Sequence, residues 1–355
     1  MTIHQHPAGQ KLRSIAALAE RGLVAPKARE RLDEVATRYA VSVTPAMAAL
    51  IDPTDPEDPI ARQFVPQAQE LVTLPQELAD PIGDEAHSPV EGVVHRYRDR
   101  ALLKLVHACP VYCRFCFRRE MVGPGGDALT GDKLDAALAY LAEHREIWEV
   151  IMTGGDPLIL SDRRVAAIAQ RLAAIEHIKV TRWHTRVPMV EPERVTADYA
   201  AALKVPGKAS YVAIHANHPR EFTPQARAAI ANLAAAGHVL LSQSVLLSGV
   251  NADVATLSAL MRAFVENGVK PYYLHHPDLA PGTSHFRLSL AEGQALVKQL
   301  RGHLSGLCQP TYILDIPGGH GKIPVGPSFL SGCDAPEGEA AAEDRHGGRH
   351  SYPPV

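Results

Sequence analysis

Three cysteines of this chain lie close together, in the run Cys109-Pro-Val-Tyr-Cys113-Arg-Phe-Cys116. Three thiolates can hold three irons of a four-iron, four-sulfur cluster and leave the fourth iron without a protein ligand, where it can react. A structural zinc site needs four ligands, and no fourth candidate lies near in the sequence. Three unrelated buried thiols are the other alternative. The spacing therefore predicts a reactive 4Fe-4S cluster at Cys109, Cys113 and Cys116.

A second segment that could do chemistry is Asp315-Ile-Pro-Gly-Gly-His-Gly-Lys322. Its glycines allow the backbone to approach a bulky ligand closely, and they place a lysine on a tight turn after a strand-like run. A plain turn with a solvated lysine is one interpretation. The other is a lysine that reacts with a ligand, which requires burial or nearby cations to remove its proton.

The cysteine run continues with Phe117-Arg118-Arg119. Together with the Asp315-to-Lys322 segment, it resembles the lysine 2,3-aminomutase family of radical S-adenosylmethionine enzymes, which includes the enzyme that prepares β-lysine for elongation factor P. The similarity extends from about Asp52 to about Leu330. The resemblance implies an isomerase that converts L-lysine to β-lysine. It also implies three cofactors, a 4Fe-4S cluster, S-adenosylmethionine (SAM) and pyridoxal 5'-phosphate (PLP), with flavodoxin or ferredoxin as the electron donor.

The resemblance also assigns residues to the PLP site. Lys322 matches the catalytic lysine that binds PLP covalently. Arg96 and Arg100 match arginines near the PLP phosphate, a role that suits planar guanidinium groups, and Gln243 matches a glutamine of the same site. The alternatives are a charged strand edge in solvent for the arginines and a structural role for the glutamine.

A glycine–glycine–acid motif occurs at Gly154, Gly155 and Asp156, after a strand-like run. In the family that the chain resembles, this motif holds the amino group of SAM. The motif by itself is weak evidence, because many strand-to-helix turns have this composition. Its position at a strand end downstream of the cysteines favours the SAM interpretation.

Three charged residues bear on the substrate. By resemblance, Arg118 pairs with the substrate α-carboxylate, while Asp278 and Asp315 bind the distal ammonium of lysine. Two carboxylates favour a cationic side chain and reject glutamate through like-charge repulsion. The alternative is that Asp278 caps a turn and Asp315 merely ends a strand.

The elements that must position these residues begin near residue 93, where strand-like and helical patterns alternate. The strand-like runs are Leu102–His107, Glu149–Thr153, Lys179–His184, Tyr211–His215, Val239–Val245 and Tyr272–His275. The helical patterns are Gly131–His144, Asp162–Ile175, Val195–Leu203, Thr223–Ala236, Asp253–Asn267 and Ser289–Leu304. Six such units predict an α/β fold, an open (βα)6 partial TIM-like barrel, since a full barrel needs about 250 residues. A doubly wound sheet is the alternative.

Three regions follow from this pattern. Residues 1–92 are expected to form a helical and extended wrapping arm, with helices over Lys11–Arg21 and Ala28–Tyr39 before a stretch rich in proline and aspartate. Residues 93–331 form the barrel with the PLP site, and the strand ends are expected to bring the site residues to one rim. Residues 332–355, rich in Gly, Glu, Ala, His and Pro, are expected to be a disordered tail.

Amino-acid composition restricts the binding partners and the cellular compartment that we expect. The 355 residues are 46% hydrophobic, with a net charge of -3 and no long Lys/Arg run, which argues against a nucleic-acid partner or an anionic membrane surface. No apolar stretch approaches the roughly 18 residues of a membrane span, and no signal core is evident. Five cysteines, three of them clustered, indicate a reducing compartment. We therefore expect a cytoplasmic protein.

The chain departs from the family pattern at several positions. His320 stands where the family turn has glycine, and Asp253 stands where long aminomutases have a cysteine that binds an intersubunit zinc. We expect no such zinc, so a possible homo-oligomer must use other contacts. Cys308 is expected to be a buried thiol and Cys333 an exposed one. Free-lysine metabolism, the elongation factor P pathway, a 2,3-aminomutase for another amino acid and a radical SAM enzyme without PLP remain open.

Overall fold

Parallel strands dominate the computed structural model, which describes residues 9–331 and 340–352. Within these residues, a nine-stranded sheet runs from β1 to β9 in chain order. Strands β2 to β8 pair in parallel, and β1 and β9 are antiparallel at the edges. The strands are β1 Val93–Tyr97, β2 Arg100–Val106, β3 Glu149–Gly154, β4 Val180–Thr185, β5 Ala209–His215, β6 Val239–Val245, β7 Lys270–His275, β8 Thr311–Ile316 and β9 Gly321–Pro324.

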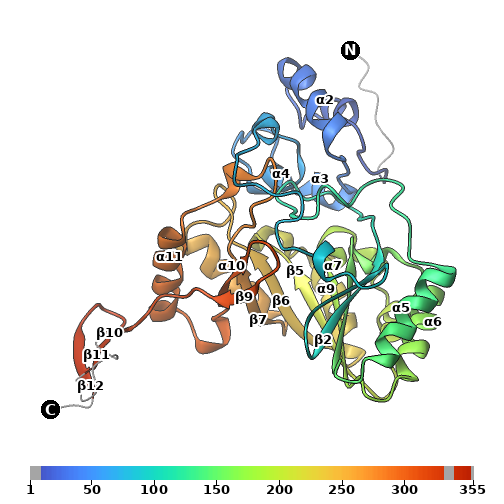
Figure 1. Ribbon diagram of the computed structural model, residues 1–355. Coiled ribbons are helices and arrows are strands. Elements are labelled where there is room, and N and C mark those ends of the chain that lie inside the picture. The colour runs from blue at the N-terminus through green and yellow to red at the C-terminus, as the bar shows by residue number, and fades with distance from the viewer. Residues whose placement is uncertain (1–8, 332–339, 353–355) are drawn as a thin grey trace.

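Each strand from β2 to β7 is followed by a helix before the next strand begins (Figure 1). These helices are α5 Gly131–Glu143, α6 Asp162–Ala173, α8 Ala197–Ala202, α9 Pro224–Ala235, α10 Val254–Glu266 and α11 Leu290–His303. The strand order never reverses, as it would in a doubly wound sheet. The predicted six-unit partial barrel is therefore confirmed, with β8 as a further parallel strand at its open side.

Local sequence explains where the barrel helices begin. The side chains of Ser161, Thr196, Thr223, Asp253 and Ser289 each accept a hydrogen bond from a backbone N–H of the first turn that follows. Such caps satisfy donors that have no partner within the helix and typically stabilise it by about 1 kcal/mol. The helices then pack their apolar faces on the sheet.

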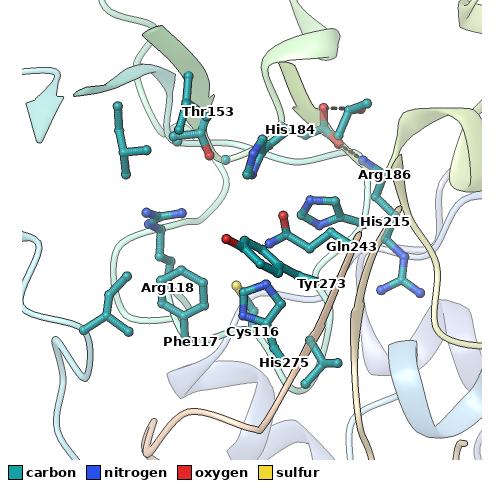
Figure 2. A pocket seen from close by; sticks show the side chains of 18 of the residues that line it. Cys116, Phe117, Arg118, Thr153, His184, Arg186, His215, Gln243, Tyr273 and His275 are labelled. Carbon is teal, nitrogen blue, oxygen red and sulfur yellow. Dashed lines mark hydrogen bonds between the residues drawn. The ribbon is translucent and has the colours of Figure 1, made fainter. Parts of the chain in front are cut away.

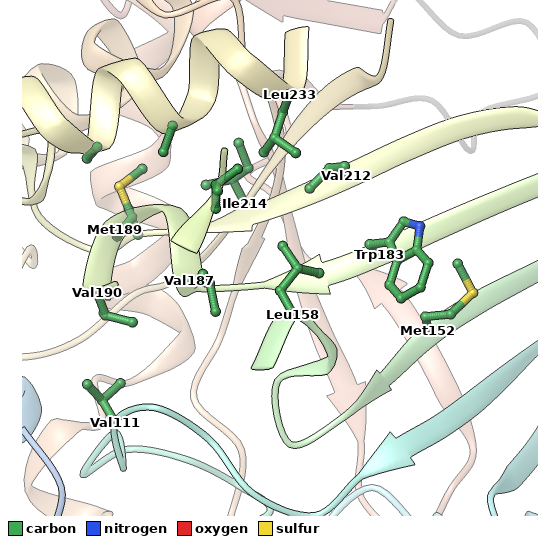
Figure 3. Packing of buried hydrophobic residues seen from close by; sticks show 14 of the residues in the cluster. Val111, Met152, Leu158, Trp183, Val187, Met189, Val190, Val212, Ile214 and Leu233 are labelled. Atoms are coloured by element: carbon green, nitrogen blue, oxygen red, sulfur yellow. The ribbon is translucent and has the colours of Figure 1, made fainter. Parts of the chain in front are cut away.

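The main core lies between the sheet and these helices. Trp183 on β4 is fully buried there, and its indole N–H donates to the carbonyl of Leu203 at 3.0 Å. Val212 and Ile214 on β5 are also buried in this layer (Figure 3). Because side chains alternate along a strand, His184, which follows Trp183, and His215, which follows Ile214, point to the inside of the barrel. The apolar residues thus build the outer layer and leave polar residues for the interior.

The N-terminal arm lies across one end of the barrel (Figure 1). It contains α1 Ile15–Glu20, α2 Arg29–Arg38, α3 Pro45–Leu50 and α4 Pro59–Phe64, so both predicted helices are present in shortened form. Beyond α4 the chain is mostly extended, as the proline-rich composition predicts. The buried carboxylate of Asp58 caps α4 and also pairs with Arg220 at 2.7 Å, which fixes the arm to the barrel.

The described part of the tail differs from the expected disorder. Within the predicted tail, strands β11 Ala340–Glu343 and β12 Arg349–Tyr352 form a small sheet with β10 Leu330–Ser331, which precedes the tail. Asp344 closes the hairpin by accepting hydrogen bonds from the N–H groups of His346 and Gly348 and by pairing with His350. This aspartate–glycine turn is the local signal that composition alone overlooks. Cys308 is buried as predicted, and Cys333 lies outside the described residues.

No helix within residues 9–331 or 340–352 is both long enough and apolar enough to cross a lipid bilayer.

Candidate functional site

A cavity of about 410 Å³ lies inside the barrel, and it brings together every residue predicted for the site. The residues come from the loops after β2, β3 and β7 and from several strands, including β8 and β9. The predicted residues in its lining are Arg96, Arg100, Cys109, Cys113, Cys116, Arg118, Gly154, Gly155, Asp156, Gln243, Asp278, Asp315 and Lys322. Two segments far apart in sequence, the cysteine run and the Asp315-to-Lys322 segment, therefore face a common space.

The cysteine loop is tight and partly buried. Cys116 N–H donates to the carbonyl of Cys113 at 3.1 Å, so the loop turns back on itself between these two thiols. Burial raises the pKa of all three thiols. Burial and the nearby Cys113 raise the pKa of Cys116 to about 11, whereas the charge of Arg186 opposes the effect of burial at Cys113. All three thiols line the same cavity, and cysteine thiolates are the ligands that an iron–sulfur cluster requires.

A buried carboxylate of the arm anchors this loop. Glu70 accepts hydrogen bonds from Arg114 at 3.0 Å and also pairs with Arg119. Burial acts to raise the pKa of Glu70, but the charge and hydrogen bonds of Arg114 outweigh it and the pKa is lowered. Arg119 also stacks 3.5 Å from the ring centre of Tyr39. The sequence analysis missed Glu70, which lies in the irregular part of the arm.

Arg186 is a second residue that sequence analysis missed. It follows β4 and lies at the wall of the cavity (Figure 2). Its guanidinium lies 3.2 Å from the sulfur of Cys113. Glu221 accepts a hydrogen bond from it at 2.8 Å and Gln63 of the arm accepts another at 2.5 Å. Arg186 is thus a cation held through both of its terminal nitrogens beside one of the three thiols. An arginine directly after a predicted strand is the only signal the sequence contains.

Gly154 and Gly155 are required by close packing against the start of the cysteine loop. A Cβ on Gly154, where φ is +121°, would lie 2.2 Å from the carbonyl oxygen of Val106. A Cβ on Gly155 would lie 2.2 Å from the carbonyl oxygen of Ala108. Larger residues would therefore push the end of β3 away from the cysteine loop.

Asp156 is turned toward the end of β4. Its carboxylate accepts hydrogen bonds from the hydroxyl of Thr185 at 2.8 Å, from Arg186 N–H at 2.7 Å and from Leu158 N–H at 3.1 Å. Burial raises its pKa. The side chain thus joins the ends of β3 and β4, and its oxygens are already engaged by donors of the protein.

Lys322 and Asp315 face each other across the antiparallel pair of β8 and β9. The Lys322 ammonium donates to both oxygens of Asp315. His275 lies 3.6 Å and Arg96 3.9 Å from the same carboxylate. Burial acts to raise the pKa of Asp315, but the hydrogen bond with His275 and the charge of Lys322 lower it to about 2. Asp315 is therefore an anion that neutralises the lysine.

The pKa of Asp278 is shifted in the opposite direction. Burial and the neighbouring charge of Asp315 raise its pKa to about 7, although Lys322, Arg118 and Arg96 act in the other direction. A carboxyl group in this environment gains from a cation placed beside it. Asp278 and Asp315 together make this part of the cavity attractive to an ammonium group.

Arg118 and Arg96 are both held by Asp84, a residue of the arm that sequence analysis also missed. Asp84 is fully buried and accepts hydrogen bonds from Arg118 at 2.8 and 3.1 Å and from Arg96 at 3.1 Å. Arg100 is farther from this cluster: it stacks 3.7 Å from the ring centre of Tyr97 and pairs with Asp99 at 2.8 Å. The Tyr97 hydroxyl in turn accepts a hydrogen bond from Lys322 N–H at 2.7 Å.

The inner wall carries Gln243 together with several imidazoles (Figure 2). The Nε2 atoms of His184, His215 and His275 are buried and have no hydrogen-bond partner among the residues that the structure describes. Burial lowers the pKa of all three histidines, so they are neutral. Buried polar atoms without partners are uncommon in proteins, and these three fit a polar ligand that occupies the cavity. Sequence analysis placed them on strands without assigning them to the site.

Comparison with known proteins adds independent information. Residues 103–255 match the family model of the radical SAM superfamily, and residues 297–336 match that of lysine-2,3-aminomutase. An L-lysine 2,3-aminomutase of Clostridium subterminale is 39% identical over 290 residues, 82% of this chain and 70% of that protein. An L-lysine 2,3-aminomutase of Escherichia coli is 35% identical over 316 residues, 88% and 90% of the two chains. A glutamate 2,3-aminomutase of Clostridioides difficile is 35% identical over 304 residues, 86% and 72% of the two chains.

Proposed function

This chain belongs to the lysine 2,3-aminomutase family of radical SAM enzymes, and we propose that it converts L-lysine to β-lysine with PLP bound at Lys322. Family membership makes it an isomerase of the aminomutase type and implies a 4Fe-4S cluster and SAM. The observation that carries the choice of lysine is the pair Asp278 and Asp315 in the same cavity as Lys322 and the three cysteines.

The cysteines hold the cluster in this proposal, and Gly154 and Gly155 let the SAM-binding strand end lie against their loop. When bound, the cluster and SAM supply a 5'-deoxyadenosyl radical, and PLP supplies the π-system on which the amino group migrates. Arg96 and Arg100 bind the PLP phosphate, and Gln243 completes the wall. Because the cluster must be reduced to act, a flavodoxin or ferredoxin serves as the electron donor.

The ion pair between Lys322 and Asp315 indicates how the charge of Asp315 stays compensated when Lys322 binds PLP. Lys322 can react with an aldehyde only after it loses its proton, and Asp315 then lacks its cationic partner. The distal ammonium of the substrate takes that place, with Asp278 on its other side. Arg118 binds the α-carboxylate at the opposite end. A glutamate side chain would instead add a third carboxylate to the two aspartates, at a large electrostatic cost.

The test is anaerobic incubation of the reduced, reconstituted enzyme with SAM and labelled lysine, with arginine, glutamate and ornithine in parallel. Chromatography of the products should show β-lysine from lysine and little or no β-amino acid from glutamate. Turnover of glutamate without turnover of lysine would overturn the substrate assignment. Cys113→Ala is the matched control: without a cluster it should form no product from any of the four amino acids.

A further inference from the structure

The arm segment from residue 80 to 87 forms a hydrogen-bonded turn that lines part of the cavity. Asp80 accepts hydrogen bonds from Asp84 N–H at 2.9 Å and from Glu85 N–H at 2.8 Å. This turn directs the Asp84 side chain inward, where it is completely buried. The arm therefore contributes a carboxylate to the interior of a site that is otherwise built by the barrel.

The same segment packs on the glycine turn that precedes Lys322. Gly318 N–H donates to the carbonyl of Pro81 at 3.2 Å. Gly83, at φ +64°, lies so close that a Cβ on it would be 2.7 Å from Cα of Gly319. The backbone of this segment thus contacts the glycine turn before Lys322, and its Asp84 side chain contacts Arg96 and Arg118. The segment therefore fixes the distance between the glycine turn and the two arginines.

Both oxygens of Asp84 are used by arginines. One accepts from Arg96 Nη2, and the other accepts from Nε and Nη2 of Arg118. A guanidinium held at two nitrogens has a fixed plane, so Nη1 of Arg118 is left to face other groups. Burial acts to raise the pKa of Asp84, but the charge of Arg118 outweighs it and the pKa is lowered. The carboxylate is therefore charged and already saturated by its two partners.

We propose that Asp84 is a positioning residue for the substrate carboxylate: it orients Arg118 from the arm and thereby sets the affinity for α-amino acids. This inference rests on the proposed role of Arg118. Asp84 does not itself contact the substrate, and it acts through the plane of the guanidinium. A second effect opposes the first, because the negative charge of Asp84 reduces the attraction of the two arginines for an anion. The positioning effect and the charge effect therefore predict opposite changes when Asp84 is neutralised.

The experiment compares Asp84→Asn with the unmodified holoenzyme by calorimetric titration, without turnover. One ligand is lysine and the other is cadaverine, which has the same distal ammonium and no carboxylate. We expect lysine binding to weaken about ten- to a hundredfold, the usual range for a hydrogen bond to a charged group, and cadaverine binding to change less than about twofold. Asp84→Glu should recover part of the loss. Glu85→Gln is the matched control, since it removes an exposed charge of the same turn and should leave both affinities unchanged.

The outcomes distinguish a positioning role of Asp84 from a purely structural role and from an effect of its charge. Equal weakening of both ligands means that Asp84 only supports the fold, and tighter lysine binding means that its charge dominates; both results overturn the inference. Unchanged lysine binding in Asp84→Asn also overturns it, while the proposed function stands. If the unmodified holoenzyme binds cadaverine but not lysine, the role of Arg118 fails first, and the proposed function fails with it.

Discussion

Asp278 and Asp315 predict opposite effects of pH on the stability of the same cavity. Burial and the charge of Asp315 raise the pKa of Asp278 to about 7 from the usual 3.8. Burial acts to raise the pKa of Asp315, but His275 and Lys322 lower it to about 2. A raised pKa means that the folded state binds the proton more tightly than the unfolded chain does. Asp278 therefore stabilises the fold below about pH 4 and loses this contribution as the pH rises through 7.

The magnitude follows from the size of each shift. One pKa unit corresponds to about 1.4 kcal/mol, so ionised Asp278 lowers the free energy of unfolding by up to about 4 kcal/mol above pH 7. Asp278→Asn should then gain stability relative to the unmodified protein by about 1.4 kcal/mol per pH unit between roughly pH 4 and 7. Asp315 has the opposite sign: its contribution is present above pH 4 and is lost as the pH falls toward 2. Asp315→Asn should therefore be less stable by about 2 kcal/mol at neutral pH.

The assay is urea unfolding of the metal-free, reduced protein at several values between pH 5 and 8, followed by tryptophan fluorescence. The metal-free form is chosen because bound cofactors complicate two-state analysis. The midpoint should shift while the slope with urea stays constant, which marks a change of stability alone. The double variant Asp278→Asn/Asp315→Asn serves as the matched control: its stability difference from Asp278→Asn should not vary over this range, since Asp315 is ionised throughout it. Asp315→Asn alone would not do, because removing its charge also lowers the pKa of Asp278. A constant difference for Asp278→Asn across the same range would refute the reasoning.

Three further predictions concern function. Lysine affinity measured by calorimetry should fall about tenfold per unit below pH 7, where Asp278 takes up a proton, and Asp278→Asn should lose this slope; a slope that persists would exclude Asp278 as its source. Lys322→Ala should lose amino migration while SAM cleavage survives, and full migration would remove the PLP assignment. Gly154→Ala should lower the iron content after reconstitution, because its Cβ would lie 2.2 Å from the Val106 carbonyl; normal iron content would contradict this.

Much of the fold could be predicted from the sequence because its signals are local. Apolar periodicity marks strands and helices within short windows, and the parallel order of β2 to β8 follows from their regular alternation with helices. The cysteine run and the Asp315-to-Lys322 segment could be found for the same reason. Since parallel strands present their carboxyl ends at one rim, the meeting of these two segments could also be expected.

The residues that the sequence analysis missed are those whose partners lie far along the chain. Asp84 is 34 positions from Arg118, and Glu70 is 44 positions from Arg114. Both acids lie in the irregular arm, where no periodic pattern indicates which side chains turn inward. Arg186 is 73 positions from Cys113. Only the folded chain brings these pairs together, so no spacing rule could have identified them.

The sequence by itself determined which chemical groups are present, their order, and the strands and turns that carry them, because these depend on neighbouring residues. The tertiary structure decided how each group behaves. Asp278 and Asp315 are the same residue type, yet the fold gives one a pKa of about 7 and the other a pKa of about 2. The physical reason is that burial and the distance to other charges set the energy of an ionised group, and both exist only once the chain is folded.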